Sequence, residues 1–329
     1  MAAADEKKIA VILLNLGGPE RIEDVRPFLY NLFSDRLIIR LGPSFMQKPI
    51  AWWIAKTRAP KSQGYYRQIG GGSPLNKITG EQCRALEQTL NGDAEAFKVV
   101  MAMRYWKPYA REVLADLAAQ GVTRLVALTL YPHYSIATTG SSIRDLEEVI
   151  SERAEKFDLI EITSWPDQKN YVDCLVERIR AGIDQKPGTE VVYSAHSLPV
   201  KFIEEGDPYL DHLKSTIRAV EEKTGVKGHL CFQSRSGPVE WLSPSTPETI
   251  EALARKGCKR ILMVPISFVS DHVETLCEID IQYKELARSH GVELVRTPSL
   301  NTDPQFIMAL KELVLSACRD EGWLSPNTA

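Results

Sequence analysis

Short, continuous apolar runs recur along the chain, and stretches with helical periodicity separate them. Strands that are buried on both faces of a parallel sheet have this pattern, because neither face meets water. The first four runs cover residues 9–15, 98–103, 124–130 and 159–165. The second four cover residues 190–195, 229–234, 260–266 and 292–297. We therefore predict eight buried strands.

The two groups of runs have the same spacing. In each group the last three runs lie about thirty residues apart, which fits strand–helix–strand units with right-handed crossovers. Helical stretches such as REVLADLAAQG and PETIEALARKG fill the gaps, and a glycine closes each of them. The pattern predicts an α/β protein made of two similar units, each with a four-stranded parallel sheet flanked by helices.

The domain boundaries follow from this repeat. We expect an N-terminal α/β domain over residues 9–165 and a C-terminal α/β domain over residues 166–312. A disordered tail (1–8) would precede them, and a C-terminal tail (313–329) would follow. The first domain carries an insertion from residue 16 to about residue 80. Ligands bind outside the carboxyl ends of the strands in such sheets, so we expect the active-site cleft between the two domains.

Composition narrows the class of protein. A chain of 329 residues suits two domains, and a net charge of −3 offers no basic excess for binding nucleic acid. No apolar run resembles a signal peptide or reaches the ~20 residues of a membrane span. The cysteines lack the spacing of a metal knuckle or a CxxC motif, which favours a reducing compartment: Cys83, Cys174, Cys231, Cys258, Cys277 and Cys318. We expect a cytoplasmic protein.

Polar and aromatic side chains follow several of the predicted strands. Arg104 follows the second strand, Tyr131 and His133 follow the third, and His196 follows the first strand of the second half. The acidic segment VSDHVETLCEIDIQ follows the seventh strand. Because the carboxyl ends of parallel strands meet at one edge of a sheet, these residues should face the same cleft. This convergence is the strongest indication of function that the pattern of residues gives by itself.

The acidic segment has the pattern of a helix that begins near Asp271 and ends at Gly291. Glu274, Glu278 and Gln282 stand at positions i, i+4 and i+8, and therefore lie on one stripe. Such a stripe could pass protons or a hard cation along its length. Alternatively, Asp271 and Glu274 form a capping box, in which Glu274 only fixes the start of the helix.

Structural interpretations compete with each of the other candidates. A lone histidine is more often a structural hydrogen-bonding residue, and three histidines fit that interpretation: His212, His229 and His290. His133 and His272 remain ambiguous, and Arg104 alone could form an inter-domain salt bridge. The GGGSP segment (70–74) lacks both G-x-G-x-x-G and G-K-[ST], so it is interpreted as a turn.

The insertion combines aromatic, apolar and basic residues. Together these residue types can lie at a membrane interface or cover a flat apolar ligand, and ordinary core packing explains any single one of them equally well. The residues concerned are Phe45, Met46, Trp52, Trp53 and Ile54, with Lys48, Lys56 and Arg58 beside them.

Several uncommon motifs occur together and in order. SAHSLP followed by GDPY resembles the signature of the ferrochelatase family, and FVSDHVETLCEID resembles its second active-site block. LLNLGGP, YRQIGGGSP, MRYWKP and YPHYSIATTGSS match further blocks, so the resemblance covers about residues 9 to 315. It implies two Rossmann-like domains of the chelatase type around a porphyrin cleft. It also implies insertion of Fe(II) into protoporphyrin IX with loss of two pyrrole protons, the terminal step of haem b biosynthesis.

The resemblance also implies roles for individual residues. The catalytic set is His196, Glu274, Asp271 and Glu278, of which His196 and Glu274 are also the candidate metal contacts. The substrate-binding set comprises Arg58, Tyr66 and Ser73 for the propionates, Arg104, Tyr131, Phe268 and His272 on the cleft walls, and Trp241 at the rim.

The sequence departs from the family pattern in two places. Ile136 stands where some members have a cluster-binding cysteine, and the tail offers only Cys318. Four thiolates hold a [2Fe–2S] cluster, so we expect none, and we expect Fe(II) as substrate with no required cofactor. Gln282 replaces the third acid of the stripe, which shortens any carboxylate relay to Glu274 and Glu278.

Some alternatives stay open. His196 could accept the pyrrole protons or ligate the iron, because neutral imidazole suits both roles. The apolar insertion favours protoporphyrin over coproporphyrin, without deciding between them. A non-catalytic porphyrin or haem carrier, or a chelatase for another metal, would also explain an aromatic cleft. Membrane contact would be peripheral, at the inner face of the membrane.

Overall fold

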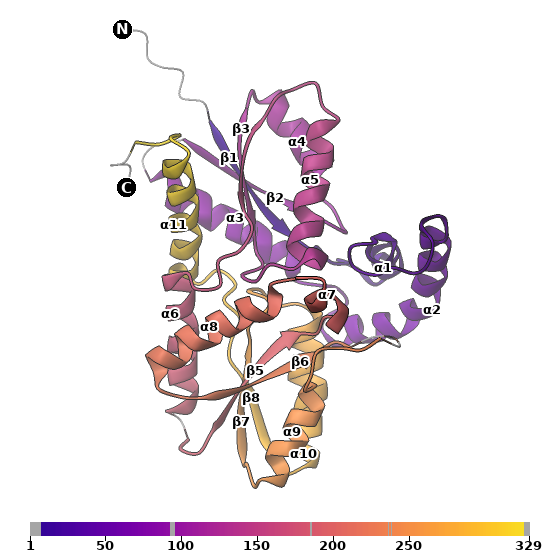
Figure 1. Cartoon of the computed structure of the whole chain (residues 1–329), viewed down its shortest axis with the longest axis vertical. Coiled ribbons are helices and arrows are strands. Elements are labelled where there is room, and N and C mark those ends of the chain that lie inside the picture. The colour runs from indigo at the N-terminus through magenta and orange to yellow at the C-terminus, as the bar shows by residue number, and fades with distance from the viewer. Residues whose placement is uncertain (1–7, 93–95, 185, 236, 238, 326–329) are drawn as a thin grey trace.

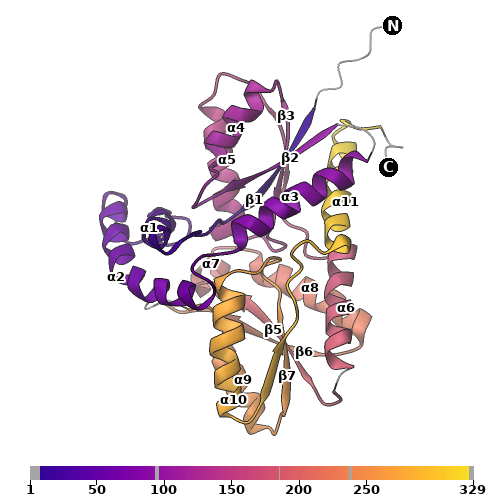
Figure 2. The same cartoon turned by 180° about the vertical axis from the view of Figure 1, so that it is seen from behind.

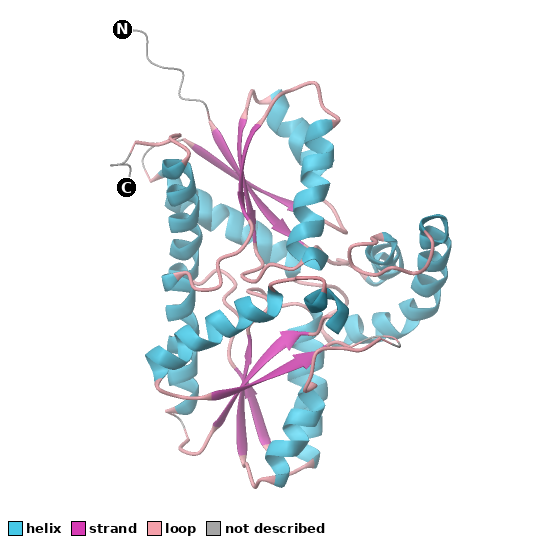
Figure 3. Ribbon diagram, in the orientation of Figure 1, coloured by secondary structure: helices cyan, strands magenta, loops and turns pink. Residues whose placement is uncertain are grey.

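The computed structural model describes residues 8–92, 96–184, 186–235, 237 and 239–325. Two four-stranded parallel sheets organise them (Figures 1 and 3). The N-terminal sheet contains β1 (Ile9–Asn15), β2 (Phe97–Met103), β3 (Arg124–Thr129) and β4 (Asp158–Ile162). The C-terminal sheet contains β5 (Glu190–His196), β6 (Gly228–Gln233), β7 (Arg260–Pro265) and β8 (Glu293–Arg296). All eight predicted strands are confirmed.

The two sheets have the same topology. Their strand orders are β2-β1-β3-β4 and β6-β5-β7-β8, and every pairing is parallel. The first strand of each half is therefore an inner strand, and β1 is buried along its whole length. This agrees with the continuous apolar runs, because inner strands covered on both faces have no polar side.

Helices cover both faces of each sheet. The helices before β5 are α3 (Leu75–Asn91), α4 (Ala110–Ala119), α5 (Ser141–Ser151) and α6 (Lys169–Ile183). Those after it are α7 (Val200–Glu204), α8 (Tyr209–Thr224), α9 (Thr246–Arg255), α10 (Lys284–Ser289) and α11 (Pro304–Asp320). Apolar residues of α4 and α5 pack on one face of the N-terminal sheet, and those of α9 and α10 pack on one face of the C-terminal sheet.

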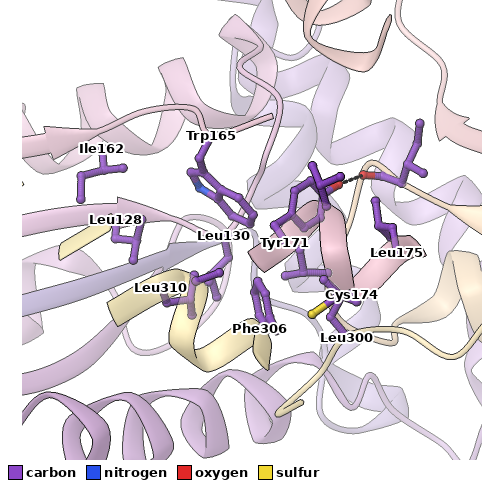
Figure 4. Close-up of a cluster of buried hydrophobic side chains, with 14 of the residues drawn as sticks. Leu128, Leu130, Ile162, Trp165, Tyr171, Cys174, Leu175, Leu300, Phe306 and Leu310 are labelled. Atoms are coloured by element: carbon purple, nitrogen blue, oxygen red, sulfur yellow. Dashed lines mark hydrogen bonds between the residues drawn. The ribbon is translucent and has the colours of Figure 1, made fainter. Parts of the chain in front are cut away.

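The opposite faces of the two sheets share one core. Phe306 and Leu310 of α11 lie close to Leu128 of β3 and to Tyr171 of α6 (Figure 4), within one buried cluster that reaches into both halves. Figure 2 shows α11 beside α3 and α6. The helix continues without a break through residues 313–320, which the sequence assigned to a tail, because its buried stripe continues as far as Cys318. The expected N-terminal tail lies, except for Lys8, outside the described residues.

The insertion forms a helical arm at the side of the molecule (Figure 1). It contains the short turns η1 (Ile22–Asp24) and η2 (Ser44–Met46) and the helices α1 (Val25–Ser34) and α2 (Gln47–Gln68). Buried side chains such as Val25, Phe28 and Ala55 hold α1 against α2 in a small core that also includes Tyr105, after β2. The GGGSP turn ends the arm, and a Cβ atom at Gly72 would lie 2.1 Å from the carbonyl oxygen of Glu20.

Two helices begin with the wider π-helical turn. The first is η3 (Ile136–Gly140), which precedes α5, and the second is η4 (Glu274–Tyr283), which precedes α10. The helix predicted from Asp271 to Gly291 is therefore present, but its first part is π-helical and begins at Glu274. Single π-helical segments of this kind are frequent at functional sites.

Candidate active site

A cavity of about 870 Å³ lies between the helical arm and the strand ends of the C-terminal half. Its volume falls within the range of small-molecule sites, about 300–1,000 Å³. The arm supplies Arg58, Lys61, Ser62, Tyr65 and Tyr66, and the facing wall supplies Gln233, Ser234, Phe268, Glu274 and Glu278. The cleft is thus confirmed in outline, although the inserted arm rather than the end of the N-terminal sheet forms much of the first wall.

His196 contacts Glu274 of the cavity wall, although 78 residues separate them along the chain; His196 itself is not among the residues that line the cavity. The Nδ1 atom of His196 lies 3.1 Å from Oε1 and 3.0 Å from Oε2 of Glu274, and Glu274 lines the cavity. The two residues come from the carboxyl end of β5 and the first turn of η4. The carboxylate accepts the Nδ1 proton, so the Nε2 lone pair of a neutral ring remains for chemistry.

The pair shifts the pKa of both groups. Burial lowers the pKa of His196, but the charge and hydrogen bond of Glu274 outweigh it and raise that pKa above its ordinary value. Burial raises the pKa of Glu274, whereas the charge and hydrogen bond of His196, with those of His272, bring that pKa well below its ordinary value. The capping-box interpretation of Glu274 is therefore wrong, because its carboxylate faces imidazoles rather than a helix start.

Glu278 and Gln282 continue along the same wall as Glu274, so the predicted stripe is confirmed. Burial, followed by the charge of Glu274, raises the pKa of Glu278 to about 7. The Ser234 hydroxyl donates to Oε2 of Glu278 at 2.7 Å. One carboxylate of the stripe is therefore charged, and its neighbour exchanges its proton near neutral pH.

Phe268 and His272 complete the wall beside His196. The ring of Phe268 lies edge-on to His196 at 6.2 Å between centroids and 4.4 Å from the ring of His272. The Nδ1 atom of His272 lies 3.0 Å from the carbonyl oxygen of Ser270, and its Nε2 atom lies 3.9 Å from Oε2 of Glu274. His272, left ambiguous by the sequence, thus lies at the cavity.

The arm presents the residues expected to bind propionates. Arg58, Tyr66 and Ser73 all line the cavity, and the Arg58 guanidinium lies 5.4 Å from the ring of Phe33. Burial, with a smaller effect from the charge of Glu274, raises the pKa of Tyr66, which keeps its hydroxyl neutral. Lys61, one helical turn beyond Arg58, adds a second cation to this wall.

Arg104 and Tyr131 do not line this cavity. Arg104 donates to Ser141 at 2.7 Å and pairs with Asp35 at 3.0 Å and Asp145 at 3.2 Å, beside a second cavity of about 500 Å³. Arg104 does form salt bridges, but both partners belong to the N-terminal half, so the predicted inter-domain salt bridge is wrong. Tyr131 is only 2 % exposed, within the core. Both residues follow strands as predicted, but their side chains turn toward their own half.

Asp271 and Trp241 also lie away from the cavity lining. The Asp271 carboxylate accepts from Ser299 at 2.8 Å and Asn301 at 2.9 Å, and it pairs with Arg296 at 3.1 Å. These partners lie in or just after β8, so the Asp271 carboxylate points toward β8 and not into the cavity. The Trp241 backbone pairs with Pro199, and its indole N–H donates to the carbonyl oxygen of Gly237 at 3.4 Å.

Sequence reasoning missed several residues of the cavity. Gln233 donates to Oε2 of Glu274 at 3.3 Å, and Arg235 follows on the same loop. Gln233 and Ser234 stand at the carboxyl end of β6, so the strand-end rule applied to that strand would have found them. Lys61 could have been found from its spacing of three residues after Arg58 on a helix.

Groups of metal ligands and membrane-spanning helices would also bear on function. Cys318 is fully buried in α11, and the predicted absence of a [2Fe–2S] cluster stays a prediction. Within the described ranges, no three His, Cys, Asp or Glu side chains are grouped as a metal-ion set. No helix in the described part of the chain is both long enough and apolar enough to cross a bilayer.

Solved structures of similar fold are chelatases of low sequence identity. SirB from Bacillus subtilis with Fe³⁺ aligns with a TM-score of 0.59 at 12 % identity, over 96 % of this chain and 98 % of that one. CbiX, described as the terminal enzyme for biosynthesis of sirohaem in denitrifying bacteria, aligns with a TM-score of 0.52 at 10 % identity, over 94 % and 99 %. At these identities the likeness shows the chelatase fold alone.

Sequence comparisons are more specific. The family model described as Ferrochelatase matches residues 8–318. The ferrochelatase of Desulfotalea psychrophila is 59 % identical over 309 residues, covering 93 % of this chain and 96 % of that protein. The ferrochelatase of Geotalea uraniireducens is 53 % identical over 313 residues, covering 94 % and 97 %. With the fold, the cavity and these relatives in agreement, the chain belongs to the ferrochelatase family.

Proposed function

We propose that the protein is a ferrochelatase that inserts Fe(II) into protoporphyrin IX, releases two pyrrole protons and forms protohaem, the terminal step of haem b biosynthesis. The contact of His196 with Glu274, which lines the cavity of about 870 Å³, is the observation that carries the proposal. Fe(II) enters without a change of oxidation state, so the reaction needs no redox partner. The remaining task for the protein is to bind the ring and to remove protons.

His196 is the proposed proton acceptor. Its Nδ1 atom is held by Glu274, so the pyrrole proton goes to Nε2, and the charge of Glu274 stabilises the imidazolium that forms. The raised pKa of His196 supports this role, because it favours uptake of a proton. The same lone pair is suited to Fe(II), so His196 and Glu274 are also the proposed metal contacts.

Glu278 is the proposed next site for the proton. Its pKa of about 7 lets it take up and release protons under neutral conditions, where a group with an ordinary carboxyl pKa would stay ionised. It is four residues after Glu274 on η4, and both side chains line the cavity. Phe268, packed between His196 and His272, is the proposed surface against which a bent porphyrin ring lies. Bending exposes the nitrogen lone pairs to the metal.

The first test is metallation itself. Purified protein is mixed with Zn(II) or, without oxygen, with Fe(II), and with protoporphyrin IX or coproporphyrin in parallel, while the absorption spectrum is followed. We expect turnover with both metals and a higher kcat/KM for protoporphyrin, because the exposed apolar arm suits the less charged ring. Tight porphyrin binding without metallation would instead support the carrier alternative.

A second prediction concerns the propionates. Arg58→Ala should raise the KM for protoporphyrin about tenfold and leave kcat within about threefold, because a charged hydrogen bond to a remote carboxylate contributes mainly to binding. Steady-state Zn(II) insertion measures both constants. Arg67→Ala is the matched control, since Arg67 is exposed on the same helix and does not line the cavity. A large loss of kcat with an unchanged KM would contradict the binding role.

The arm also supports a proposal of peripheral membrane contact at the inner face of the membrane, in an otherwise cytoplasmic protein. Phe45 is 77 % exposed, Trp53 is 62 % exposed and Trp52 is 49 % exposed, all within nine residues. The Arg26 guanidinium and the Lys56 ammonium each lie 5.3 Å from the Trp52 ring. Aromatic rings with adjacent cations suit the interface of an anionic bilayer.

Replacing both Trp52 and Trp53 with serine should therefore weaken binding to phosphatidylglycerol-containing vesicles about tenfold or more, while kcat for detergent-solubilised porphyrin stays unchanged. Co-sedimentation with vesicles measures the affinity, and added salt should weaken what remains. Met308→Ser serves as the control, because Met308 is an exposed apolar residue on α11. Equal binding of the tryptophan variant and the unmodified protein would refute the contact.

A further inference from the structure

The GDPY motif has no role in the chemistry described above, yet its aspartate joins the two halves of the protein. Asp207 lies in the loop between α7 and α8 of the C-terminal half. Its Oδ2 atom accepts from the Ser135 hydroxyl at 2.9 Å and from the Ile136 backbone N–H at 2.8 Å. Both of these residues stand at the start of η3 in the N-terminal half. Its other oxygen accepts from the Tyr209 N–H at 3.0 Å.

One carboxylate therefore meets the beginnings of two helices, one from each half. Backbone N–H groups at a helix start lack partners within the helix, and the helix dipole favours a negative charge there. The Ser135 hydroxyl also accepts from the Ala137 N–H at 3.2 Å, so it links the carboxylate to the next turn of η3. Displacing Asp207 would leave donors of both halves unpaired.

Tyr209 connects Asp207 to His196 through hydrogen bonds. It is the first residue of α8 and is buried, and its hydroxyl donates to the backbone carbonyl oxygen of His196 at 2.9 Å. On the other side, the His196 N–H donates to the Ser267 hydroxyl at 2.8 Å. The His196 backbone is thus fixed from both sides, and Tyr209 provides the link that leads to the N-terminal half.

We propose that Asp207 and Tyr209 are positioning residues that set His196 against the porphyrin held by the N-terminal half; this inference rests on the proposed function. The propionate-binding residues belong to the arm, whereas His196 belongs to the C-terminal sheet. A porphyrin bound by the arm meets the imidazole correctly only if the two halves keep their register. A misplacement of a reacting group by 1 Å can cost about a hundredfold in rate.

Two variants test the proposal. Tyr209→Phe removes only the hydroxyl that donates to the His196 carbonyl oxygen. Asp207→Asn replaces one accepting oxygen with an amide N–H₂ group, which cannot accept a hydrogen bond. Both should lower kcat for Zn(II) insertion about tenfold or more and leave the KM for protoporphyrin within about twofold, because the arm is untouched. As His196 loosens from Glu274, its raised pKa should also fall, which moves the acid limb of the pH profile to lower pH.

Thr216→Val is the matched control. Thr216 lies on α8 seven residues after Tyr209, and its hydroxyl contacts His133 Nε2 at 2.9 Å across the same interface, without reaching His196. It should lower the melting temperature as the test variants do, with unchanged kcat and an unchanged acid limb. A kcat within twofold of the unmodified protein in both test variants would overturn the inference.

A second measurement keeps the test independent of activity. In protein with ¹³C-labelled histidine, NMR follows the titration of His196, identified by its absence in His196→Gln. A lower titration midpoint in Tyr209→Phe and Asp207→Asn, but not in Thr216→Val, supports the inference. Identical midpoints in all of them contradict it. Unmodified protein that fails to metallate any porphyrin would contradict the proposed function alone, while this titration still decides the role of Asp207 and Tyr209.

Discussion

Replacing His196 with alanine is expected to reduce metallation of protoporphyrin by about 10³-fold or more, with Zn(II) and with Fe(II) alike. The imidazole is the proposed base, the charge of Glu274 raises its pKa above the ordinary value, and general-base catalysis contributes about 10²–10⁴ in rate. Without it, Glu274 keeps its place on the wall but loses the larger of the two imidazole interactions that lower its pKa. The measurement is the initial rate of the absorption change on metal insertion.

The fold should survive this change, because His196 stands at the end of β5 and part of its side chain is exposed. Circular dichroism and thermal unfolding check that point. His290→Ala is the control, since His290 is exposed at the end of α10. Turnover of the His196 variant near that of the unmodified protein would defeat the assignment. Loss of Zn(II) binding in the absence of porphyrin would show that His196 also serves as a ligand.

Replacing Glu274 with glutamine should lower kcat about 10²–10³-fold and change the pH dependence in a defined direction. Glutamine has the same size but no charge, so it does not stabilise the imidazolium. In the unmodified protein the acid limb of kcat/KM should lie above pH 6.5, because the neutral base is required and its pKa is raised. In the variant that limb should move to lower pH, since burial is then opposed only by the smaller effect of the charge of Glu278.

The difference in stability between the unmodified protein and Glu274→Gln should also depend on pH. The depressed pKa of Glu274 contributes stability that is present above pH 4.5 and is lost as the pH falls. The raised pKa of His196 contributes stability that is present below pH 6.5 and is lost as the pH rises through the folded-state value. The unmodified protein should therefore exceed Glu274→Gln in melting temperature most clearly between pH 4.5 and pH 6.5.

Glu285→Gln provides the control for both measurements, because Glu285 is an exposed carboxylate on α10, the helix that continues η4. It should leave the rate and the acid limb unchanged. If Glu274→Gln kept its acid limb where the unmodified protein has it, the limb would have to come from a group other than the His196–Glu274 pair.

The helical arm supplies most of the cavity wall that belongs to the N-terminal half. Arg104 and Tyr131, at the end of the N-terminal sheet, do not line the cavity, so the cavity-lining side chains of that half come mainly from α1, α2 and the turn after α2. The core of the arm is separate from the cores on the two sheets, and Tyr105, after β2, joins it to the N-terminal half. The proposed propionate-binding residues and the proposed membrane contact therefore lie largely within one inserted element.

Local pattern alone determined the strands, their repeat in two halves, and the stripe of Glu274, Glu278 and Gln282. These features depend on spacing along the chain, and spacing follows from the geometry of a strand or a helix turn. The place of His196 after a strand also followed from the sequence, because parallel strands bring their carboxyl ends to one edge.

Only the tertiary structure decided which strand-end residues reach the cavity. Arg104 and Asp271 have the right positions in the sequence, but partners such as Asp35 and Arg296 form ion pairs with them and hold them elsewhere. Such partners are distant along the chain, so no local pattern reveals them. The same reason applies to α11, whose apolar stripe is visible in the sequence, whereas the surface that it covers exists only once both halves have folded.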